Sequence, residues 1–565
     1  MSVIDWVILI GTLVFIVAYG TWKTRGSNTM QGYLMGGNDM KWYTIGLSVM
    51  ATQASAITFL STPGQAYEDG MRFVQFYFGL PIAMVILSVT ILPIFYRLKV
   101  YTAYEYLEGR FDLRSRLLAA FLFLLHRGLA AGITIYAPAI ILSKILGWPL
   151  NLTNLIIGVL VIIYTVSGGT RAVSQTQKQQ MAVIFAGMVA AFVLIVYMLP
   201  ENVSFGNALH IAGNMGKLDA VDFSFDIEER YTFWSGLTGG VFLFLAYFGT
   251  DQSQVQRYLS GKSVTEGRLG LLFNGLLKIP MQFFILLTGV MVFIFYQFVQ
   301  PPVYFNDAGL AEIRSSKDSA ALVYYENRFA LNFDKKQEHI QGLLIASEQG
   351  EESLAQEKRQ RINKLEKENQ KIRDKVKEMH EKVRPDAETK DSDYIFITFI
   401  MNYLPKGVIG LLLAVIMSAA MSSTAGELNA LGSTTIVDFY KRTIKKDGSD
   451  EHYLKMSKVF TAAWGGLAIL FAVFASLVDN LIQAVNILGS IFYGPVLGIF
   501  LAAFFIKRIG SSAVFYGAIV AQLFNIFLYF TSDIGFLWFN AIGCINVIVL
   551  SMIFSFFKPK VTPET

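Results

Sequence analysis

Long apolar runs recur along almost the whole chain, and they restrict its fold more than any other feature of the sequence. A run of roughly 17 residues or more can cross a bilayer as a helix. Only 16% of the residues are charged, against about 25% in soluble domains. We therefore predict an all-α integral membrane protein with about 13 transmembrane helices, near residues 5–22, 43–66, 73–96, 117–146, 152–168, 180–199, 233–251, 269–298, 395–424, 457–478, 480–506, 511–530 and 535–557.

Basic residues are unequally distributed between the loops that join these runs. Alternate short loops hold 23 Lys or Arg residues, whereas the opposite short loops hold only Arg72, Lys217 and Arg230. Because basic loops stay in the cytoplasm, we predict an outer N-terminus and a cytoplasmic C-terminus in a plasma (bacterial inner) membrane. The first run has no cleavage site and is a retained anchor. The net charge of +5 thus reflects topology in the lipid bilayer and not nucleic-acid binding.

The spans and one polar segment divide the chain into five parts. These are the first span with its cytoplasmic loop (1–40), spans two to eight (41–298), an extracytoplasmic insertion (299–394), the rest of the second half (395–510), and two C-terminal spans with a tail (511–565).

Cys544, the only cysteine, lies in the last span, which excludes an intrachain disulfide and a thiolate metal site.

The insertion contains a charged helix with a heptad pattern between residues 355 and 384. Its a and d positions hold Ile362, Leu365, Asn369, Ile372, Val376, Met379 and Val383, and an Asn at an a position fixes the register of two strands. One interpretation is a homodimer or an outer-face partner bound through 355–384. The other is a helix that folds back on 336–350 as an intramolecular hairpin.

Polar residues interrupt the ninth apolar run and continue beyond its end. Ser418, Ser422, Ser423, Thr424, Glu427 and Asn429 lie where hydrocarbon is expected. Polar groups at membrane depth are costly, and they persist mostly where they line a bundle interior or an ion path. Adjacent hydroxyls on Ser422 and Ser423 are hard oxygen ligands suited to a small cation.

Two other runs contain the signs of a broken helix. In the second run, polar residues precede Pro63-Gly64, and the seventh has Gly249, Thr250 and Asp251 near its inner end. A broken helix exposes backbone carbonyls, which are tolerated at depth only beside a cavity or an ion. These breaks begin two five-span blocks, 43–199 and 233–506, a pattern typical of inverted-repeat secondary transporters.

Several motifs resemble those of the sodium:solute symporter family, which includes the sodium/glucose, iodide, monocarboxylate and multivitamin cotransporters. They occur in the expected order across residues 40–510 and are FYRLKVYTAYEYLEGRF (95–111), YAPAIIL (136–142), YTVSGGTRAV (164–173), GTDQSQVQRYLSGKS (249–263), MSSTAGELNALGSTTIVDFYKR (421–442) and GSIFYGPVLGIF (489–500). The resemblance implies a LeuT-type 5+5 inverted repeat, with one extra span before it and two after it.

The same resemblance implies a sodium (Na⁺) site between the second and ninth spans. Its ligands, transferred by motif, are the backbone carbonyls of Ala51, Ala54 and Ala419 and the hydroxyls of Ser422 and Ser423. Neutral oxygens can replace the hydration shell of an ion and still release it.

The small-molecule solute is expected beside that site, near the middle of the bilayer. The candidate residues are Gln53, Ser55 and Thr58 on the second span, Gln75 on the third, Arg127 on the fourth, Tyr247 on the seventh and Lys278 on the eighth. The resemblance aligns Tyr247 with a position that gates the inner exit, and Lys278 with one that contacts sugar in a bacterial glucose-type member.

Two residues of the fourth span have more than one interpretation. Arg127 is charged at any accessible pH and needs a partner at this depth. It either holds a solute carboxylate or forms a structural ion pair with Glu427. His126 is interpreted as a hydrogen-bonded core residue in preference to a proton carrier.

The chain departs from the family after the YTVSGG motif. Many members carry there an aspartate that serves a second sodium site, whereas this chain has Gln177 followed by Lys178. Because a neutral amide beside a cation compensates a sodium charge poorly, we predict one sodium ion per cycle.

Together these features predict a sodium-coupled symporter that imports a sugar, a sugar acid or a monocarboxylate by alternating access. The alternative is a sensor with a transporter fold that signals through the outer coiled segment. We do not expect an enzyme, because the sequence contains no nucleophile–base pair, metal cluster or phosphate loop.

Overall fold

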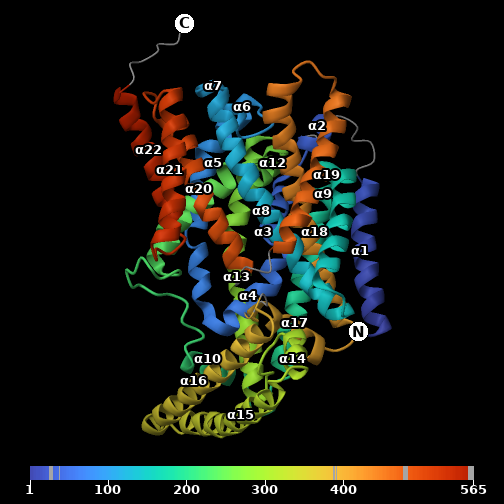
Figure 1. Ribbon diagram of the computed structural model, residues 1–565, viewed down its shortest axis with the longest axis vertical. Coiled ribbons are helices and arrows are strands. Elements are labelled where there is room, and N and C mark those ends of the chain that lie inside the picture. Colours follow the sequence, from blue (N-terminus) through green and yellow to red (C-terminus); the bar gives the residue numbers. More distant parts are fainter. Residues whose placement is uncertain (24–29, 37, 386–388, 390, 475–480, 558–565) are drawn as a thin grey trace.

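The computed structural model describes residues 1–23, 30–36, 38–385, 389, 391–474 and 481–557. Within these ranges the chain is helical, and its only β contact is an isolated bridge between Met40 and Gly261. The helices stand roughly parallel in one bundle (Figure 1). The N-terminus lies at the end of the bundle that carries α15 and α16, and α22, the last described helix, ends at the opposite end (Figure 1).

The first half of the chain contains the following helices. They are α1 (Val3–Lys23), α2 (Met30–Met35), α3 (Trp42–Gln53), α4 (Ala56–Asp69), η1 (Gly70–Tyr77), α5 (Leu80–Val89), α6 (Ile91–Leu98), α7 (Glu105–Arg110), α8 (Leu113–Leu146), α9 (Leu150–Tyr197) and α10 (Phe205–Asn214).

The second half of the chain contains the rest of the bundle and a hairpin of two long helices, α15 and α16. Its helices are η2 (Ser235–Gly239), α11 (Gly240–Gly249), α12 (Gln252–Leu259), α13 (Val264–Phe298), α14 (Asp307–Arg314), α15 (Ser319–Glu348), α16 (Glu352–Val383), α17 (Ser392–Tyr403), α18 (Val408–Thr434), η3 (Thr435–Ile444), α19 (Asp450–Phe474), α20 (Leu481–Phe505), α21 (Ser511–Thr531) and α22 (Trp538–Phe557).

Nine helices of the described ranges are long and apolar enough to cross a membrane. Shorter apolar helices at Val3–Ile16, Leu150–Ile163 and Ser235–Gly249 accompany them. The count of thirteen spans stays a prediction, because several predicted spans are divided or joined here. For example, the predicted runs 152–168 and 180–199 both lie in α9, which is bent at Gly169 (φ 60°, ψ −177°).

The structure divides the predicted ninth run, 395–424, between two helices. α17 ends at Tyr403, and α18 begins at Val408 after a turn that contains Pro405 and Gly407. Proline restricts the residue before it to extended conformations, and Gly407 has φ +92°, which favours glycine. The boundaries of the predicted ninth run were therefore wrong, and the span that holds Ser422 and Ser423 starts later than expected.

Both runs are broken as predicted, but the first break lies before Pro63-Gly64, which stays inside α4. α3 ends at Gln53 and α4 begins at Ala56, while α11 ends at Gly249 and α12 begins at Gln252. At the second break Asp251 caps α12 by accepting a hydrogen bond from the Ser253 amide (2.9 Å). Carboxylates are among the preferred caps at helix N-termini, so the sequence at this break also starts the next helix.

The insertion is a hairpin of two long helices, α15 and α16, at one end of the bundle (Figure 1). Asn332 Nδ2 donates to Asn369 Oδ1 (3.1 Å), and Lys336 Nζ pairs with Glu366 (2.7 Å) across the hairpin. The heptad residues Ile362, Asn369, Ile372, Val376 and Met379 are buried. Their seam is thus occupied within the chain, as in the intramolecular interpretation, with α15 as the partner helix.

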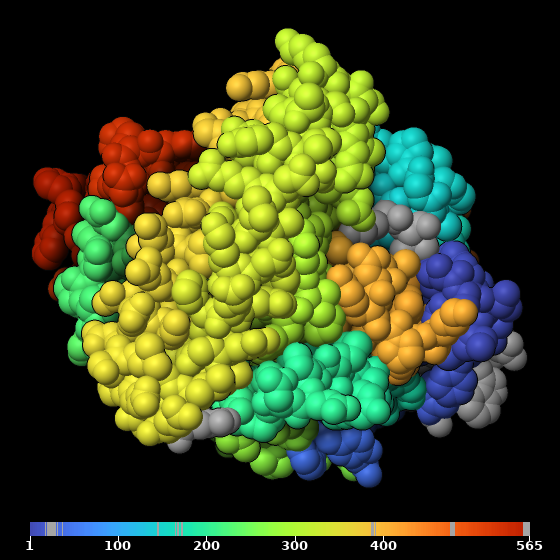
Figure 2. Space-filling model, turned by 90° about the horizontal axis from the view of Figure 1, so that it is seen from below, coloured from blue at the N-terminus to red at the C-terminus, as the bar shows by residue number. Residues whose placement is uncertain are grey.

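Figure 2, which views the molecule from the hairpin end, shows these two helices spread across the middle of that face. The base of the hairpin is fastened by Asp391, which accepts from the Phe305 amide (2.7 Å) and pairs with Lys377 (2.6 Å). The hairpin is therefore fastened to this end of the bundle at its base.

Candidate functional site

The break between α3 and α4 lies at the centre of the candidate site. Across it the Ala54 amide donates to Met50 (2.8 Å) and the Thr58 amide donates to Ser55 (3.0 Å). Neither bond uses the carbonyl of Ala51 or Ala54. These two oxygens therefore remain available as ligands, as the predicted sodium site requires.

The hydroxyls of Ser422 and Ser423 lie in the middle of α18, and both are buried. Ser423 Oγ donates to the carbonyls of Ala419 (3.0 Å) and Ala420 (3.2 Å), while Ser422 Oγ has no hydrogen-bond partner in the described part of the chain. A buried hydroxyl without a partner is costly. Its position on a helix that also offers Ala419 suits a bound cation.

α18 approaches the broken helix closely at one point. A Cβ atom added to Gly426 would lie 3.4 Å from Thr52 Cγ2 of α3 and 2.9 Å from Arg257 Nη2 of α12. A glycine at this position leaves room for these two side chains beside α18. The two halves of the predicted sodium site thus lie on neighbouring helices.

A cavity lies between the broken helix and the helices α8, α11, α18 and α20. It is lined by Thr52, Gln53, Ser55, Ile57, Thr58, Phe76, Tyr77, Arg127, Thr134, Leu243, Phe244, Tyr247, Glu427, Ile482, Val485, Asn486 and Tyr493. Five of the seven predicted solute residues therefore meet here, namely Gln53, Ser55, Thr58, Arg127 and Tyr247. Aromatic walls with a few polar groups are typical of small-molecule sites.

Arg127 lies at the side of this cavity within a buried cluster of charges. Its Nη1 donates to Glu427 (3.1 Å), and its Nη2 pairs with Asp251 and donates to Tyr493 (2.5 Å). Its guanidinium also lies 5.4 Å from the centre of the Tyr247 ring. The predicted pair with Glu427 is present, and the same arginine borders the cavity, so the two interpretations of Arg127 are not exclusive.

The cluster carries more negative than positive groups. Glu427 Oε2 also accepts from Thr134 (2.7 Å), and Asp251 also accepts from Ser253 and Tyr493. One guanidinium faces two carboxylates, so these three groups sum to −1 when both carboxylates are ionised and His126 is neutral. His126 lies 3.7 Å from Asp251 and packs against the rings of Tyr493 and Phe492, as expected for a core residue.

The structure does not place Gln75 or Lys278 on the cavity wall. The Gln75 amide donates to the carbonyl of Tyr231 (2.8 Å) and accepts from the amide of Asp222 (2.8 Å). It therefore fastens an outer loop. Lys278 is buried behind the cavity wall, with its ammonium 5.8 Å from the Tyr77 ring and without a hydrogen bond in the described ranges.

Lys278 belongs to a buried polar stripe that the sequence analysis did not identify. Asn274, Lys278 and Gln282 follow at intervals of four on α13, so they share one face. All three are fully buried, and their side-chain polar atoms have no hydrogen-bond partner within the described ranges. The spacing was visible in the sequence, whereas its position against the broken helix depends on the packing of α13 on α3 and α4.

Gln177 lies on α9 and is hydrogen-bonded to α3. Ser48 Oγ donates to Gln177 Oε1, and Gln177 Nε2 donates to Thr52 Oγ1 (3.0 Å). Both ends of the amide are thus used between the two helices. A side chain so engaged is a poor candidate for a second sodium ligand.

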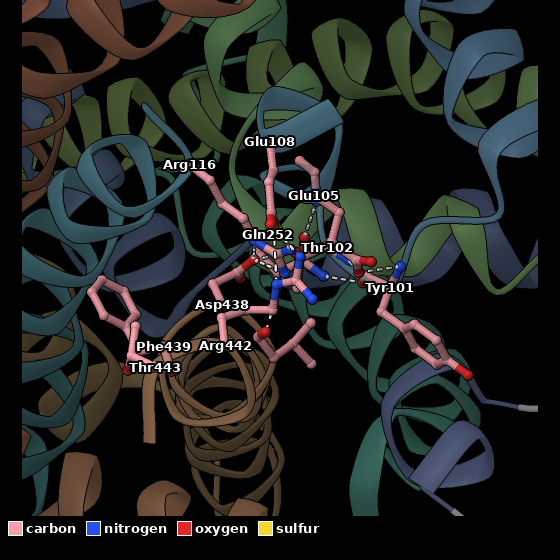
Figure 3. Close-up of polar contacts among 12 residues, drawn as sticks. Tyr101, Thr102, Glu105, Glu108, Arg116, Gln252, Asp438, Phe439, Arg442 and Thr443 are labelled. Carbon is pink, nitrogen blue, oxygen red and sulfur yellow. Dashed lines mark hydrogen bonds and ion pairs between the residues drawn. The ribbon is translucent and has the colours of Figure 1, made fainter. Parts of the chain in front are cut away.

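A network of charged residues lies near α7, at the end of the bundle opposite the hairpin (Figure 1), and Figure 3 shows its contacts. Arg116 of α8 contacts Asp438 (2.7 Å), Glu108 (2.7 Å) and the Val437 carbonyl (3.1 Å). Thr102 donates to the same aspartate (2.8 Å), and Arg442 of η3 pairs with Glu108. The network joins the loop before α7 to the end of the helix that bears Ser422 and Ser423.

The network is also linked to the second helix break. Gln252, which follows Asp251 and begins α12, donates to the Tyr101 carbonyl (2.8 Å) and accepts from the Ala103 amide (3.1 Å). Asp251 pairs with Arg127 at the cavity, so adjacent residues of α12 contact the cavity cluster and the network. A displacement of this segment would therefore change contacts both at the cavity cluster and in the network.

Comparison with known proteins reveals extensive similarity. The sequence model of the sodium:solute symporter family matches residues 33–314 and 383–521. Sodium-coupled monocarboxylate transporter 1 of Mus musculus is 28% identical over 501 residues, which cover 88% of this chain and 68% of the relative. The sodium/sialic acid symporter of Proteus mirabilis is 26% identical over 565 residues, covering 97% and 94%.

The fold is similar to a solved structure as well. A Na⁺-coupled sialic acid symporter in a substrate-bound, outward-open state superposes with a TM-score of 0.75 at 23% identity, over 99% of this chain and 98% of the other. The fold is thus the predicted LeuT-type inverted repeat. The unmatched interval 315–382 coincides with α15 and α16.

Proposed function

The chain belongs to the sodium:solute symporter family, and from this premise we propose that it imports a small carboxylate, either a monocarboxylate or a sugar acid, together with sodium. Sodium is the coupling ion of the family. The observation that carries the proposal is the cavity itself, where a helix broken at Ala54 and Ser55 meets a buried arginine. Such half-helices at mid-membrane are the usual binding elements of secondary transporters.

The sodium ligands that we propose are the carbonyls of Ala51, Ala54 and Ala419 and the hydroxyls of Ser422 and Ser423. Support comes from the unengaged carbonyls at the break, the unpartnered Ser422 hydroxyl, and the close approach of α18 to α3. An ion held by both helices favours the state in which they lie together. Its release would let them separate.

The proposed solute is a carboxylate because Arg127 borders the cavity beside hydroxyl and amide groups from the broken helix. A guanidinium binds a carboxylate through two parallel hydrogen bonds. The solute would displace one acidic partner of Arg127, and Glu427 is the one of the two that lines the cavity. A neutral sugar would use Gln53, Ser55 and Thr58 alone and would leave the cluster intact.

The charge of the cluster explains why the two substrates would enter together. With both carboxylates ionised, an anion alone would meet two negative groups and one guanidinium in this cluster. Ser423 and Glu427 are four residues apart on α18, about 6 Å along its axis. At that distance a sodium ion attracts the carboxylate by about 3 kcal/mol at an effective dielectric constant of 20, so bound sodium would prepare the site for an anion.

We also propose an outer N-terminus, a cytoplasmic C-terminus and a bacterial inner membrane location. The positive-inside pattern supports this orientation, and α1 begins at the end of the bundle opposite to that where α22 ends (Figure 1). The hairpin then faces outward, and the network around Arg116 lies at the cytoplasmic end.

The experiment that tests the function begins with the solute. Purified protein is screened for thermal stabilisation by carboxylates and sugars with and without sodium, because only a true ligand adds stability. Uptake of the best solute is then measured in proteoliposomes under a sodium gradient. We expect uptake to require sodium and to fall by at least about tenfold in Ser422→Ala and Ser423→Ala, since each loses an ion ligand.

One sodium ion per cycle is expected, because Gln177 is a neutral amide engaged by Ser48 and Thr52. The sodium dependence of uptake should therefore have a Hill coefficient near about 1. A coefficient near about 2 that survives Gln177→Ala would refute the single site. Uptake without sodium would refute the coupling, and stabilisation by neutral sugars alone would refute the carboxylate.

A further inference from the structure

The N-terminal helix α1 is joined to α18 by one buried carboxylate. Asp5 has no exposed surface, and its Oδ1 accepts hydrogen bonds from the amides of Gly407 (2.6 Å) and Gly410 (3.2 Å). These amides belong to the first turn of α18, which begins at Val408. The two helices lie about 400 residues apart in sequence, so this contact is wholly tertiary.

The other oxygen of the same carboxylate completes the start of α1. Asp5 Oδ2 accepts from the Ser2 amide (2.7 Å) and from the Ser2 hydroxyl (2.7 Å), and Ser2 Oγ accepts from the Asp5 amide (3.4 Å). This reciprocal pattern is a capping box, in which the N-cap and the third helical residue satisfy each other. Asp5 therefore caps two helices at once.

α18 has no cap of its own. A helix leaves its first four amides without internal partners, and the residue at the capping position, Gly407, has no side chain. The amides of Val408 and Ile409 donate to the Pro405 carbonyl (3.2 and 3.4 Å), and Asp5 receives those of Gly407 and Gly410. All four amides are satisfied, and the negative charge lies at the positive end of the helix dipole.

The fit between the two helices depends on glycine. A Cβ atom on Gly410 would lie 2.2 Å from the Asp5 carbonyl oxygen, and one on Gly407 would lie 3.4 Å from Ile8 and 3.6 Å from Ile4. Gly407 also needs its positive φ of 92°. The start of α18 is thus held by hydrogen bonds and by close backbone contact along α1.

We propose that Asp5 is a positioning residue for sodium binding, an inference that rests on the sodium site of the proposed function. Ser422 lies fifteen residues beyond Gly407 on α18, about 22 Å along the helix. A rigid helix transmits a shift or rotation at its start to that level, and binding groups need to be held within about 0.5 Å. Asp5 fixes the axial position of α18 against α1, and thereby the position of its serine hydroxyls.

The test measures sodium binding directly and needs no organic solute. Purified full-length protein is titrated with ²²Na⁺, and its melting temperature is recorded in parallel. For Asp5→Ala we expect the sodium Kd to rise about tenfold, the equivalent of losing one strong helix cap. For Asp5→Asn we expect about threefold, because the amide oxygen still accepts from both glycine amides while the charge is lost.

Ser2→Ala is the matched control. It removes the capping box of α1 and leaves the contacts with Gly407 and Gly410, so its melting temperature should fall while its sodium Kd stays within about twofold of wild type. A purely structural role for Asp5 would lower the melting temperature of every variant without changing the Kd. An unchanged Kd in folded Asp5→Ala, or an equal rise in Ser2→Ala, would overturn the proposal.

If Asp5→Ala does not accumulate in the membrane, the sodium Kd of Asp5→Asn is compared with that of Ser2→Ala to test the role of Asp5. A higher Kd in Asp5→Asn alone supports the proposal, and equal values overturn it. Wild-type protein that binds no ²²Na⁺ would refute the sodium site itself. Wild-type binding with unaffected Asp5 variants would refute only the role of Asp5.

Discussion

Glu427 follows Ser423 by one helical turn and touches the guanidinium of Arg127 at the cavity wall. It therefore stands between the proposed ion and the proposed anion. Its carboxylate can attract the sodium ion, and it also binds the guanidinium of Arg127 where the solute carboxylate would bind. A substitution that keeps the shape of Glu427 and removes its charge therefore tests its electrostatic role.

Glu427→Gln removes the charge and keeps an oxygen that can accept from Arg127 and Thr134. We expect sodium affinity to fall by about tenfold or more, since an attraction of about 3 kcal/mol is lost. Titration with ²²Na⁺ measures the change. Thr134→Val, which removes a hydrogen bond to the carboxylate but no charge, should shift the affinity by less than about threefold. Equal affinities for Glu427→Gln and wild type would exclude an electrostatic role for Glu427.

Some residues of the site could be predicted from the sequence and some could not. Gln53, Ser55, Thr58 and Tyr247 reach the cavity because the break of a membrane helix forces polar groups towards an interior. Gln75 looked equivalent, but a loop with free backbone groups at Asp222 and Tyr231 takes both ends of its amide. The pairing of Arg127 with Asp251 spans 124 residues, and no local pattern contains such a contact.

At the scale of elements, the bend in α9 depends on a single glycine. Gly169 has φ +60°, and a Cβ atom there would lie 2.6 Å from the ring of Tyr33 and 2.9 Å from its carbonyl oxygen. The bend separates the two apolar halves of α9. It also brings α2 against α9, where Thr170 donates to the Leu34 carbonyl (2.8 Å).

Gly169→Ala should therefore destabilise the protein by at least about 2 kcal/mol, through the strained φ and the contact with Tyr33. Gly466→Ala on α19 is the control, because nothing lies within 4 Å of the added methyl group. It should be neutral or stabilise by up to about 1 kcal/mol, as expected for alanine inside a helix. Thermal unfolding in detergent compares the two, and similar melting temperatures would contradict the assignment of the bend to Gly169.

The apolar runs predicted correctly that these segments are helices. They did not predict the end of α17, the start of α18 or the partner of α16. The turn at Pro405 and Gly407 lies inside a nearly continuous apolar run, so hydropathy alone joined α17 to α18. The heptads of α16 correctly indicated a two-helix seam. A heptad pattern does not specify whether its partner is a second chain or another helix, and here it is α15.

At the scale of the whole molecule, the same two helices, α12 and α18, connect the cavity to the charged network. α12 reaches the cavity cluster through Asp251 and the network through Gln252, and α18 continues into η3, which holds Asp438. The network ties together segments at the end that we propose is cytoplasmic, and Figure 3 shows its contacts. Opening that end would require either that the ion pair between Arg116 and Asp438 breaks or that the two residues move together.

Asp438→Asn should favour inward opening, because it removes one of the two carboxylates that hold Arg116. The reporter is Asn486→Cys, which lines the cavity, and the natural Cys544 is buried and gives little background. Labelling by a maleimide applied to the cytoplasmic face should become about tenfold faster. Arg114→Ala, which breaks an exposed ion pair on the same face, should change the rate by less than about twofold. Equal rates in both backgrounds would exclude a gating role.

The hairpin of α15 and α16 leaves and re-enters the bundle at almost the same place, where Asp391 joins the Phe305 amide and Lys377. The family's sequence model omits these two helices. An insertion whose ends already meet can be gained, lost or exchanged in evolution without stretching the transport core. The hairpin is thus a separate module joined to the transport core, and its sequence can diverge independently of that core.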